Sequence, residues 1–223
     1  MQNSLQQSIQ NAAFHSENKK YDNKRPLMYC YGCDRRCSTE CAKLNKNKDC
    51  NGLEFYIWPD NNSYLVEGIL PYVREVNDKL ISQPIVIIDF NHKNIDCFLS
   101  KNWLDCFKNM RLILVADKKM TAIAHYWFYN DTVDTIISAV IFYDDTKDEI
   151  VAKVKNSFLA KITKPAENKP KLSTNEYSLF SFLYKGELPK KIALKNETSV
   201  KNVYAMKKRI ELKLGVLISR LSN

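Results

Sequence analysis

Short apolar segments alternate with amphipathic stretches between Leu53 and Ile162. Three of these segments, "QPIVIIDF", "MRLILVA" and "TIISAVIF", are rich in β-branched residues and are bounded by turn-forming, polar or charged residues. Apolar runs of this length and composition are typical of strands that are buried in a sheet. We therefore predict three buried strands in this part of the chain.

The stretches around these strands have helical spacing. In "NIDCFLSKNWLDCFKNM" the large apolar residues recur near helical spacing, and "KKMTAIAHYWFYND" predicts a helix whose aromatic run belongs to the core. "TKDEIVAKVKNSFLAKI" predicts another helix. Its single apolar stripe comprises Ile150, Val151, Val154, Phe158 and Ile162. Strands that alternate with helices predict an α/β domain with a parallel sheet.

A helical region follows the segment "TKPAENKPK", which has two prolines and no apolar stripe and is therefore predicted to be a linker. Ser173 and Glu176 have the spacing of a capping box, and Leu172 and Tyr177 occupy the positions of a hydrophobic staple around it. Leu179, Phe180 and Leu183 supply the buried face, and Gly186 is expected to end this helix in a left-handed conformation.

Two more helices are expected after Gly186. Pro189 suits the first turn of a short helix that closes near Lys195, and Thr198 or Ser199 can cap the next helix. The apolar stripe of this last helix comprises Val203, Met206, Ile210 and Leu214, and Gly215 follows it. Two helices joined by a tight polar turn predict a helix-turn-helix. Its outward face would carry Lys201, Tyr204, Ala205, Lys207 and Lys208.

The motifs "LSTNE", "KKIA", "TSVKNV" and "KLGV" lie in this order in the last quarter of the chain. Together they resemble the LuxR/FixJ-type DNA-binding domain, in residue types as well as in spacing. Asn196 and Thr198 stand where that family usually has apolar residues. Asn202 stands in place of a threonine and Met206 in place of a histidine.

The run "HYWFYND", followed by "LPKKIA" and "SVKNVY", is similar to a narrower group, the EcpR/MatA regulators of fimbrial operons. This resemblance implies a transcriptional regulator, with activation of a surface-adhesion operon as its expected role. The helix over residues 199–214 would read the major groove, and the expected partner is double-stranded DNA.

The charge of the chain agrees with a polyanionic partner. The net charge is +9, with 34 Lys and Arg against 25 Asp and Glu. Residues 161–223 hold 14 basic and 5 acidic side chains, so the rest of the chain carries 20 of each sign and no net charge. A basic C-terminal region of this kind favours nucleic acid as the partner, whereas a merely solvated basic face is the alternative.

These patterns define four segments and a two-domain architecture. Residues 1–52 form a mobile, cysteine-containing segment, 53–162 a receiver-like α/β regulatory domain, 163–171 the linker, and 172–223 an all-α helix-turn-helix domain. The chain shows no signal-peptide pattern at its start and no apolar run long enough for a membrane helix, so a cytoplasmic protein is expected.

Relatives of the LuxR/FixJ type often carry a phosphorylated receiver domain in the position of this α/β domain. Asp89, near the end of a predicted strand, stands where the phosphoryl acceptor would lie. No upstream strand ends in paired acidic residues, and Ala116 stands where a hydroxyl is expected. Because Mg²⁺ would lack its acidic ligands, the pattern favours a degenerate receiver-like scaffold.

Five cysteines lie close together in the N-terminal segment, which leaves two interpretations. Four thiolates after a C-x₂-C start can hold Zn²⁺ or an iron–sulfur cluster. The same spacing also places small side chains on one face of a helix, and without a second C-x₂-C pair we favour simple packing or incidental thiols and assign no metal. These residues are Cys30, Cys33, Cys37, Cys41 and Cys50. Cys97 and Cys106 are expected in the core.

No catalytic motif stands out. The five glycines do not cluster into a phosphate-binding loop, and His15, His92 and His125 lack a nucleophile or carboxylate at a recognisable spacing. His125 is expected to be packed in the core. We therefore expect a protein that is not an enzyme and that uses no cofactor.

The candidate site is the surface that would contact DNA. Tyr204 and Ala205 can touch a thymine methyl, Lys208 can reach guanine acceptors or a phosphate, and the remaining lysines suit phosphates. The set comprises Lys190, Lys191, Ser199, Lys201, Asn202, Tyr204, Ala205, Lys207 and Lys208. A homodimer, or a heterodimer with another regulator, is the expected assembly. The alternatives are an adaptor that heterodimerises without binding DNA, and a metal- or redox-responsive regulator.

Overall fold

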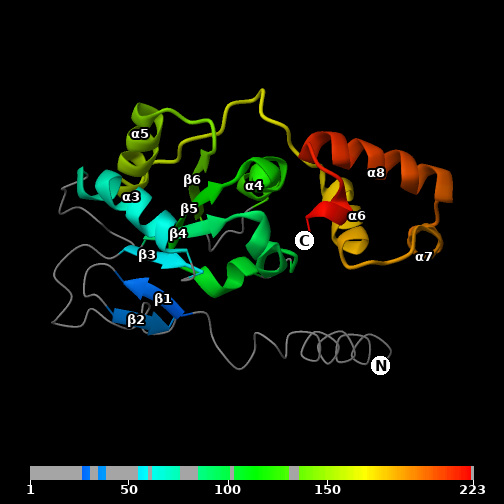
Figure 1. Cartoon of the computed structure of the whole chain (residues 1–223), viewed down its shortest axis with the longest axis horizontal. Helices are drawn as coiled ribbons and strands as arrows, with labels where there is room; N and C mark the ends of the chain where they lie inside the picture. The colour runs from blue at the N-terminus through cyan, green and yellow to red at the C-terminus, as the bar shows by residue number, and fades with distance from the viewer. Residues whose placement is uncertain are drawn as a thin grey trace.

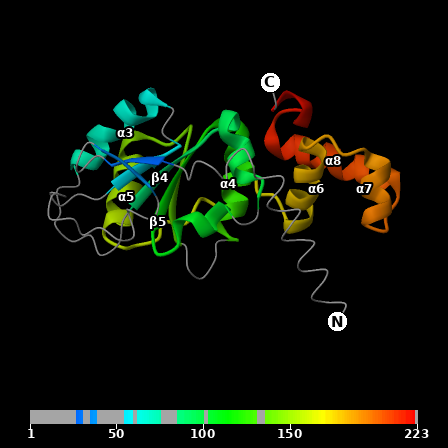
Figure 2. The ribbon, with the colours of Figure 1, turned by 90° about the horizontal axis from the view of Figure 1, so that it is seen from below.

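A computed structural model of the chain describes residues 27–30, 35–38, 55–59, 62–75, 85–100, 103–130 and 136–221. These residues form an α/β unit built on one sheet, with a unit of three helices beside it (Figures 1 and 2). Among them, no helix has the length and apolar content that crossing a membrane requires.

The sheet has the strand order β2-β1-β3-β4-β5-β6. Neighbouring strands from β3 to β6 run parallel, whereas β1 and β2 form an antiparallel hairpin whose β1 pairs with β3. The three predicted strands are confirmed as β4, β5 and β6, and four parallel strands with helices fit a receiver-like α/β domain. The bounds are β1 (Leu27–Cys30), β2 (Arg35–Ser38), β3 (Phe55–Trp58), β4 (Ile85–Phe90), β5 (Arg111–Ala116) and β6 (Ile136–Phe142).

The hairpin lies in the cysteine-containing segment, for which the apolar pattern predicted no strand. Cys30 ends β1 and Cys37 lies in β2, so the proposal that the cysteines share one helix face is wrong for these two. The backbone pairs Met28 with Cys37 and Cys30 with Arg35. Cys33, Cys41 and Cys50 lie outside the described residues, and so does His15.

Two helical layers cover the sheet. Helices α3 (Ser63–Glu75) and α5 (Lys147–Phe158) pack on one face, where Ile87 and Ile113 meet side chains such as Val73. The opposite face, which carries Ile88, is covered by α4 (Thr121–Phe128) and three 3₁₀ segments. These are η1 (His92–Phe98), η2 (Trp103–Phe107) and η3 (Lys118–Met120). Alternate strand residues thus enter different cores, as the two-residue period of a strand requires.

The helix expected over "NIDCFLSKNWLDCFKNM" is replaced by the two 3₁₀ segments η1 and η2. Large rings from both segments, Phe98 and Trp103, pack on Trp58 of β3, with ring centroids 5.8 and 6.5 Å away. This tertiary packing outweighs the helical spacing. Cys97 is half-buried against the core, but Cys106 is exposed, so its predicted burial is wrong. Ile162 is also exposed, because α5 ends at Phe158.

The three-helix unit comprises α6 (Thr174–Tyr184), α7 (Pro189–Lys195) and α8 (Val200–Leu214), followed by η4 (Ile218–Arg220). The capping box of Ser173 and Glu176 is present, and Pro189 lies in the first turn of α7. Gly186 and Gly215 both have positive φ, as the predicted helix ends require. The local signals in the sequence therefore set the ends of these helices correctly.

Candidate nucleic-acid interface

Helix α8 has a buried side and an outward side. Val203, Ile210 and Leu214 are buried against the rest of the three-helix unit. At about 100° per residue, Lys201 and Lys208 project on the opposite side of the helix. Both are exposed, and so are Ala205 and Tyr204, whose exposed fraction is 55%. The predicted outward face is thus a continuous solvent-accessible surface.

The turn between α7 and α8 fixes where α8 begins. Ser199 is the N-cap, and its Oγ accepts a hydrogen bond from Asn202 N at 3.1 Å. Asn202 Nδ2 donates to Thr198 Oγ1 at 3.3 Å, and Glu197 has a positive φ of 49°. The structure therefore places Ser199 and Asn202 on the exposed N-terminal turn of α8, where both also stabilise the helix start.

The remaining predicted lysines fall into two groups. Lys190 and Lys191 lie exposed in the first turn of α7, beside the turn that leads to α8. Lys207 is half-buried, and its Nζ lies 3.9 Å from Oε1 of Glu211, one helical turn further along α8. Lys207 therefore lies at the margin of the outward face rather than at its centre.

Arg209 and Leu212 are exposed residues of α8 that the predicted contact set omits. Arg209 follows Lys208, and Leu212, with an exposed fraction of 74%, lies one turn beyond Lys208 on the same outward side. The helical spacing from Lys201 through Ala205 and Lys208 would have identified Leu212.

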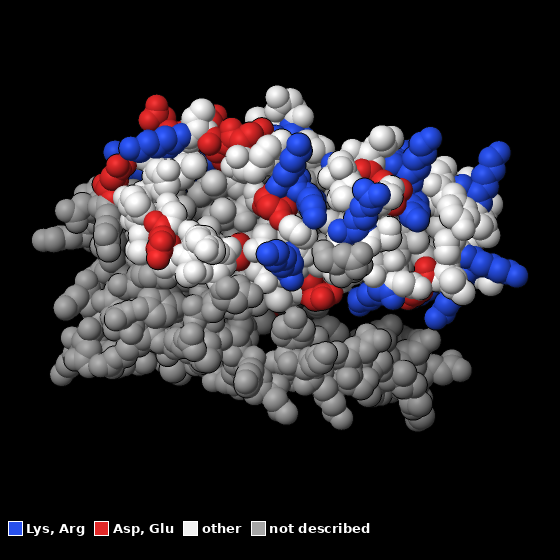
Figure 3. Space-filling model, in the orientation of Figure 1, with Lys and Arg blue, Asp and Glu red and all other residues white. Residues whose placement is uncertain are grey.

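Basic side chains gather over the three-helix unit on the right in Figure 3.

An ion pair holds α8 against α6. Lys213 Nζ donates to Glu176 Oε2 at 2.6 Å, and the same carboxylate accepts from Ser173 N at 2.8 Å. Burial alone would raise the pKa of Glu176, but the hydrogen bonds from Lys213 and Ser173 outweigh it and lower that pKa. This buried carboxylate links the start of α6 with the end of α8 and so orients the outward face.

A hollow of about 320 Å³ with a mixed polar and apolar lining lies beneath the start of α8, between α8 and α6. Amide and hydroxyl side chains contribute much of its lining, together with Leu179, Val203 and Met206. The polar members are Asn175, Ser178, Asn196, Thr198 and Asn202. Asn196 and Thr198 are the two residues that depart from the LuxR/FixJ pattern, and both face this hollow rather than an apolar core.

A second polar cluster surrounds Asp89 at the carboxyl end of the parallel strands. Asp89 is 3% exposed, and its Oδ2 accepts hydrogen bonds from the side-chain amides of Asn91, Asn62 and Asn94 at 2.7, 3.0 and 3.1 Å. Burial raises the pKa of Asp89, and the three amides and nearby Asp117 act in opposite directions on that pKa. Three neutral amide donors thus surround Asp89 Oδ2.

The neighbouring strand end brings Asp117 near Asp89, but the Asp117 carboxylate is paired with His92. Ala116 ends β5, and Asp117 beyond it lies 2.5 Å from His92 Nδ1 and caps η3 through Met120 N. His92 therefore has a carboxylate partner that its sequence spacing did not indicate. Within the described ranges, no cluster of three or more His, Cys, Asp or Glu residues could hold a metal ion.

His125 is packed in the core, as predicted, with an exposed fraction of 3%. Its Nδ1 lies 3.1 Å from the carbonyl oxygen of Lys169 and 3.3 Å from that of Pro170. Burial lowers the pKa of His125, which favours the neutral imidazole. The role of this histidine is to hold the segment that leads into α6.

Comparison with known proteins identifies the family. The family model for the EcpR N-terminal domain matches residues 29–158, which is more than half of the chain. The protein therefore belongs to the EcpR N-terminal domain family. A relative in Escherichia coli (strain K12), the uncharacterized protein YqeH, is 26% identical over 196 residues, which cover 87% of this chain and 91% of YqeH.

Solved structures of RcsB are similar over part of the chain. A structure of two RcsB dimers bound to two parallel DNAs has a TM-score of 0.43 and 19% identity, over 73% of this chain and 94% of the RcsB chain. A complex of the two-component response regulator RcsB with DNA has a TM-score of 0.34 and 18% identity, over 72% and 81% of the two chains.

Proposed function

We propose that the protein is a DNA-binding transcription regulator that reads the major groove with α8. The observation that carries this proposal is the outward face of α8, on which Lys201 and Lys208 flank exposed Ala205 and Tyr204. An α-helix fits into the major groove of DNA. The buried side of α8 keeps the three-helix unit folded while its outward side meets the DNA.

Each side chain has a role that its chemistry supports. Lys201, Lys190 and Lys191 contact phosphates, which gives affinity for any sequence. Tyr204 and Ala205 touch base edges such as a thymine methyl, and Lys208 reaches guanine acceptors or a phosphate. Ser199 and Asn202 position the first turn of α8 on the backbone, and Lys207 adds charge at the margin.

The concentration of charge supports a polyanionic partner. The whole net charge of +9 resides in residues 161–223, which include the three-helix unit. A charge of this sign attracts DNA at long range before specific contacts form. Membership of the EcpR N-terminal domain family and the motifs "LPKKIA" and "SVKNVY" support activation of a fimbrial or other surface-adhesion operon as the biological role.

The α/β unit acts in this proposal as a degenerate receiver-like scaffold, without phosphorylation at Asp89. The three amides on Asp89 Oδ2 support this role, because they replace the charged surroundings that phosphoryl transfer needs. A symmetric dimer suits regulators that bind paired half-sites, so we propose a homodimer or a heterodimer with another regulator.

The test is a salt titration of DNA binding on two duplexes: the DNA upstream of the gene's own operon, called the operator here, and a scrambled duplex of the same composition. Lys201→Ala is expected to weaken binding to both duplexes alike and to lower the salt slope by about 1, as for one lost phosphate contact. Tyr204→Ala is expected to weaken operator binding by about 1–3 kcal/mol more than scrambled binding. Lys155→Ala, on exposed α5 surface, is the matched control and should change neither.

Two results would contradict the proposal. Wild-type protein that shows no salt-sensitive DNA binding, yet alters transcription in cells, would favour the adaptor that heterodimerises without binding DNA. Equal losses for Lys155→Ala and Lys201→Ala would show that binding follows net charge and not the outward face of α8.

A further inference from the structure

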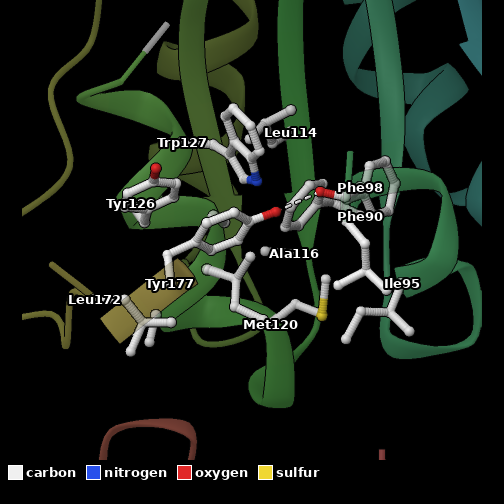
Figure 4. Close-up of a cluster of buried hydrophobic side chains, with 14 of the residues drawn as sticks. Phe90, Ile95, Phe98, Leu114, Ala116, Met120, Tyr126, Trp127, Leu172 and Tyr177 are labelled. Carbon is white, nitrogen blue, oxygen red and sulfur yellow. Dashed lines mark hydrogen bonds between the residues drawn. The ribbon is translucent and has the colours of Figure 1, made fainter. Parts of the chain in front are cut away.

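Tyr177 belongs to α6 of the three-helix unit, yet its side chain is built into the α/β unit. Its exposed fraction is 1%, and its hydroxyl donates a hydrogen bond to the carbonyl oxygen of Phe98 at 2.6 Å (Figure 4). Phe98 is the last residue of η1 and lies 79 positions earlier in the chain. One side chain therefore ties the start of α6 to the α/β core.

The ring of Tyr177 is held by two aromatic residues of α4. It stacks on Tyr126 with centroids 4.2 Å apart and planes 10° apart, and it meets the edge of Trp127 at 5.3 Å and 76°. The ring centroid of Phe180, also in α6, lies 6.3 Å from that of Tyr177. Aromatic contacts of this geometry favour one orientation of each ring, so they fix the angle at which α6 meets α4.

The chain segment that precedes α6 also contacts α4. Leu172 N donates to the carbonyl oxygen of Ala122 at 3.3 Å, and His125 Nδ1 lies within 3.3 Å of two carbonyl oxygens of residues 169 and 170. Lys171 Nζ lies 4.3 Å from the ring centroid of Tyr129. The segment over residues 163–171 contains no helix or strand, but its end is held along α4.

In this docked arrangement the outward face of α8 is unobstructed. Helix α4 lies between the sheet and the three-helix unit, with α6 and α8 against it (Figures 1 and 2). Lys201, Tyr204 and Lys208 nevertheless remain exposed. An arrangement that blocked DNA binding would cover these residues.

We propose that Tyr177 is a positioning residue that docks the three-helix unit on α4 and η1, and that this docked arrangement is the one that binds DNA. The second part rests on the proposed function. The inference gives the α/β unit a defined task, which is to hold α8 facing outward at a fixed orientation.

Limited proteolysis of the full-length chain measures docking directly. The bond after Lys171 reports docking, because Leu172 is buried against α4, whereas the bonds after Lys164 and Lys169 precede proline and resist trypsin. Tyr177→Phe removes the hydroxyl and leaves the buried Phe98 carbonyl without its donor, so undocking should become about tenfold more frequent. Cleavage after Lys171, identified by fragment mass, should therefore become about tenfold faster at a temperature where circular dichroism shows both proteins folded.

Tyr129→Phe is the matched control. It removes a hydroxyl beside the same segment from a residue that is 43% exposed, and it keeps the ring beneath Lys171. Cleavage in this control should match the wild type. Equal cleavage rates for Tyr177→Phe and the wild type would overturn the docking role of Tyr177.

The same assay with operator duplex decides which arrangement binds DNA. If the docked form binds, the DNA complex of the wild type stays as resistant at the bond after Lys171 as the unbound protein, or becomes more resistant. A tenfold faster cleavage in the complex would show that the docked form must open, and would overturn the positioning role. If the wild type binds no DNA at all, the proposed function fails, while the cleavage of Tyr177→Phe still decides docking.

Discussion

Replacing Asp89 by alanine should destabilise the protein much more than replacing it by asparagine, because all three amide donors point at one oxygen atom. Asn62, Asn91 and Asn94 each donate to Oδ2 of Asp89. Asp89→Ala removes this acceptor from the partly buried side-chain amides of Asn62 and Asn91, whereas Asn94 Nδ2 still donates to the backbone carbonyl oxygen of residue 89 at 3.2 Å. A buried donor that loses its partner costs about 1–3 kcal/mol, and water can reach part of this cluster, so we expect a total loss of about 2–4 kcal/mol.

Asp89→Asn keeps an acceptor in the same place. Its side-chain oxygen can occupy the position of Oδ2 and accept the same three hydrogen bonds, while the cost of burying a negative charge disappears. The free energy of unfolding should therefore stay within about 1 kcal/mol of the wild type at neutral pH. For a chain of this length, the alanine variant should melt about 4–16 °C lower, at 2–4 °C per kcal/mol.

The contribution of Asp89 to the free energy of unfolding should depend on pH. Because the folded pKa of Asp89 lies above its ordinary value of 3.8, the folded state binds the proton more tightly than the unfolded state does. The contribution of Asp89 to stability is thus greatest below pH 3.8 and declines as the pH rises toward the folded pKa. This decline should be absent in Asp89→Asn.

Urea unfolding of the three proteins between pH 3.5 and 7 measures both effects, and a promoter reporter measures function. Asp89→Asn should also leave promoter activation unchanged, since no phosphorylation is expected at this position. The reasoning would be refuted if Asp89→Asn destabilised the protein as much as Asp89→Ala. A loss of activation in Asp89→Asn, with the protein folded and present at normal level, would refute the degenerate-receiver interpretation.

Two further predictions concern the ion pair and the cysteines. Glu176→Gln should lower the free energy of unfolding by about 1–2 kcal/mol at pH 7, because it removes the negative charge that Lys213 faces. This difference should shrink as the pH falls through the folded pKa of Glu176, which lies below 4.5. Lys207→Gln, which breaks the half-exposed pair with Glu211, should cost less than about 0.5 kcal/mol in the same urea titration. Replacing Cys30 and Cys33 by serine should change DNA affinity by no more than a few-fold. The wild type purified without oxygen should contain no stoichiometric zinc or iron. One metal ion per chain in the wild type that the double variant loses would instead establish a metal site.

Local signals in the sequence determined the three-helix unit almost completely. Ser173 with Glu176, Gly186, Pro189 and Gly215 specify helix ends through hydrogen bonds and backbone angles that involve only nearby residues. The outward face of α8 followed from the spacing of its buried residues, since a helix of known period has only one face opposite its apolar stripe. The buried strands β4, β5 and β6 were evident for a similar reason, because their apolar runs are continuous.

Contacts between distant residues decided the rest. The edge hairpin of β1 and β2 carries no apolar alternation, so only its pairing with β3 defines it. The segments η1 and η2 have apolar residues at helical spacing, but they form short 3₁₀ helices whose rings, Phe98 and Trp103, pack on Trp58. The partners of Asp89 lie up to 27 positions away, and the acceptor of Tyr177 lies 79 positions away. Tyr177 has the spacing of a hydrophobic staple within its own helix. Its docking role arises because α4 and η1 bring a stacking ring and a carbonyl oxygen to it, and no local pattern encodes that meeting.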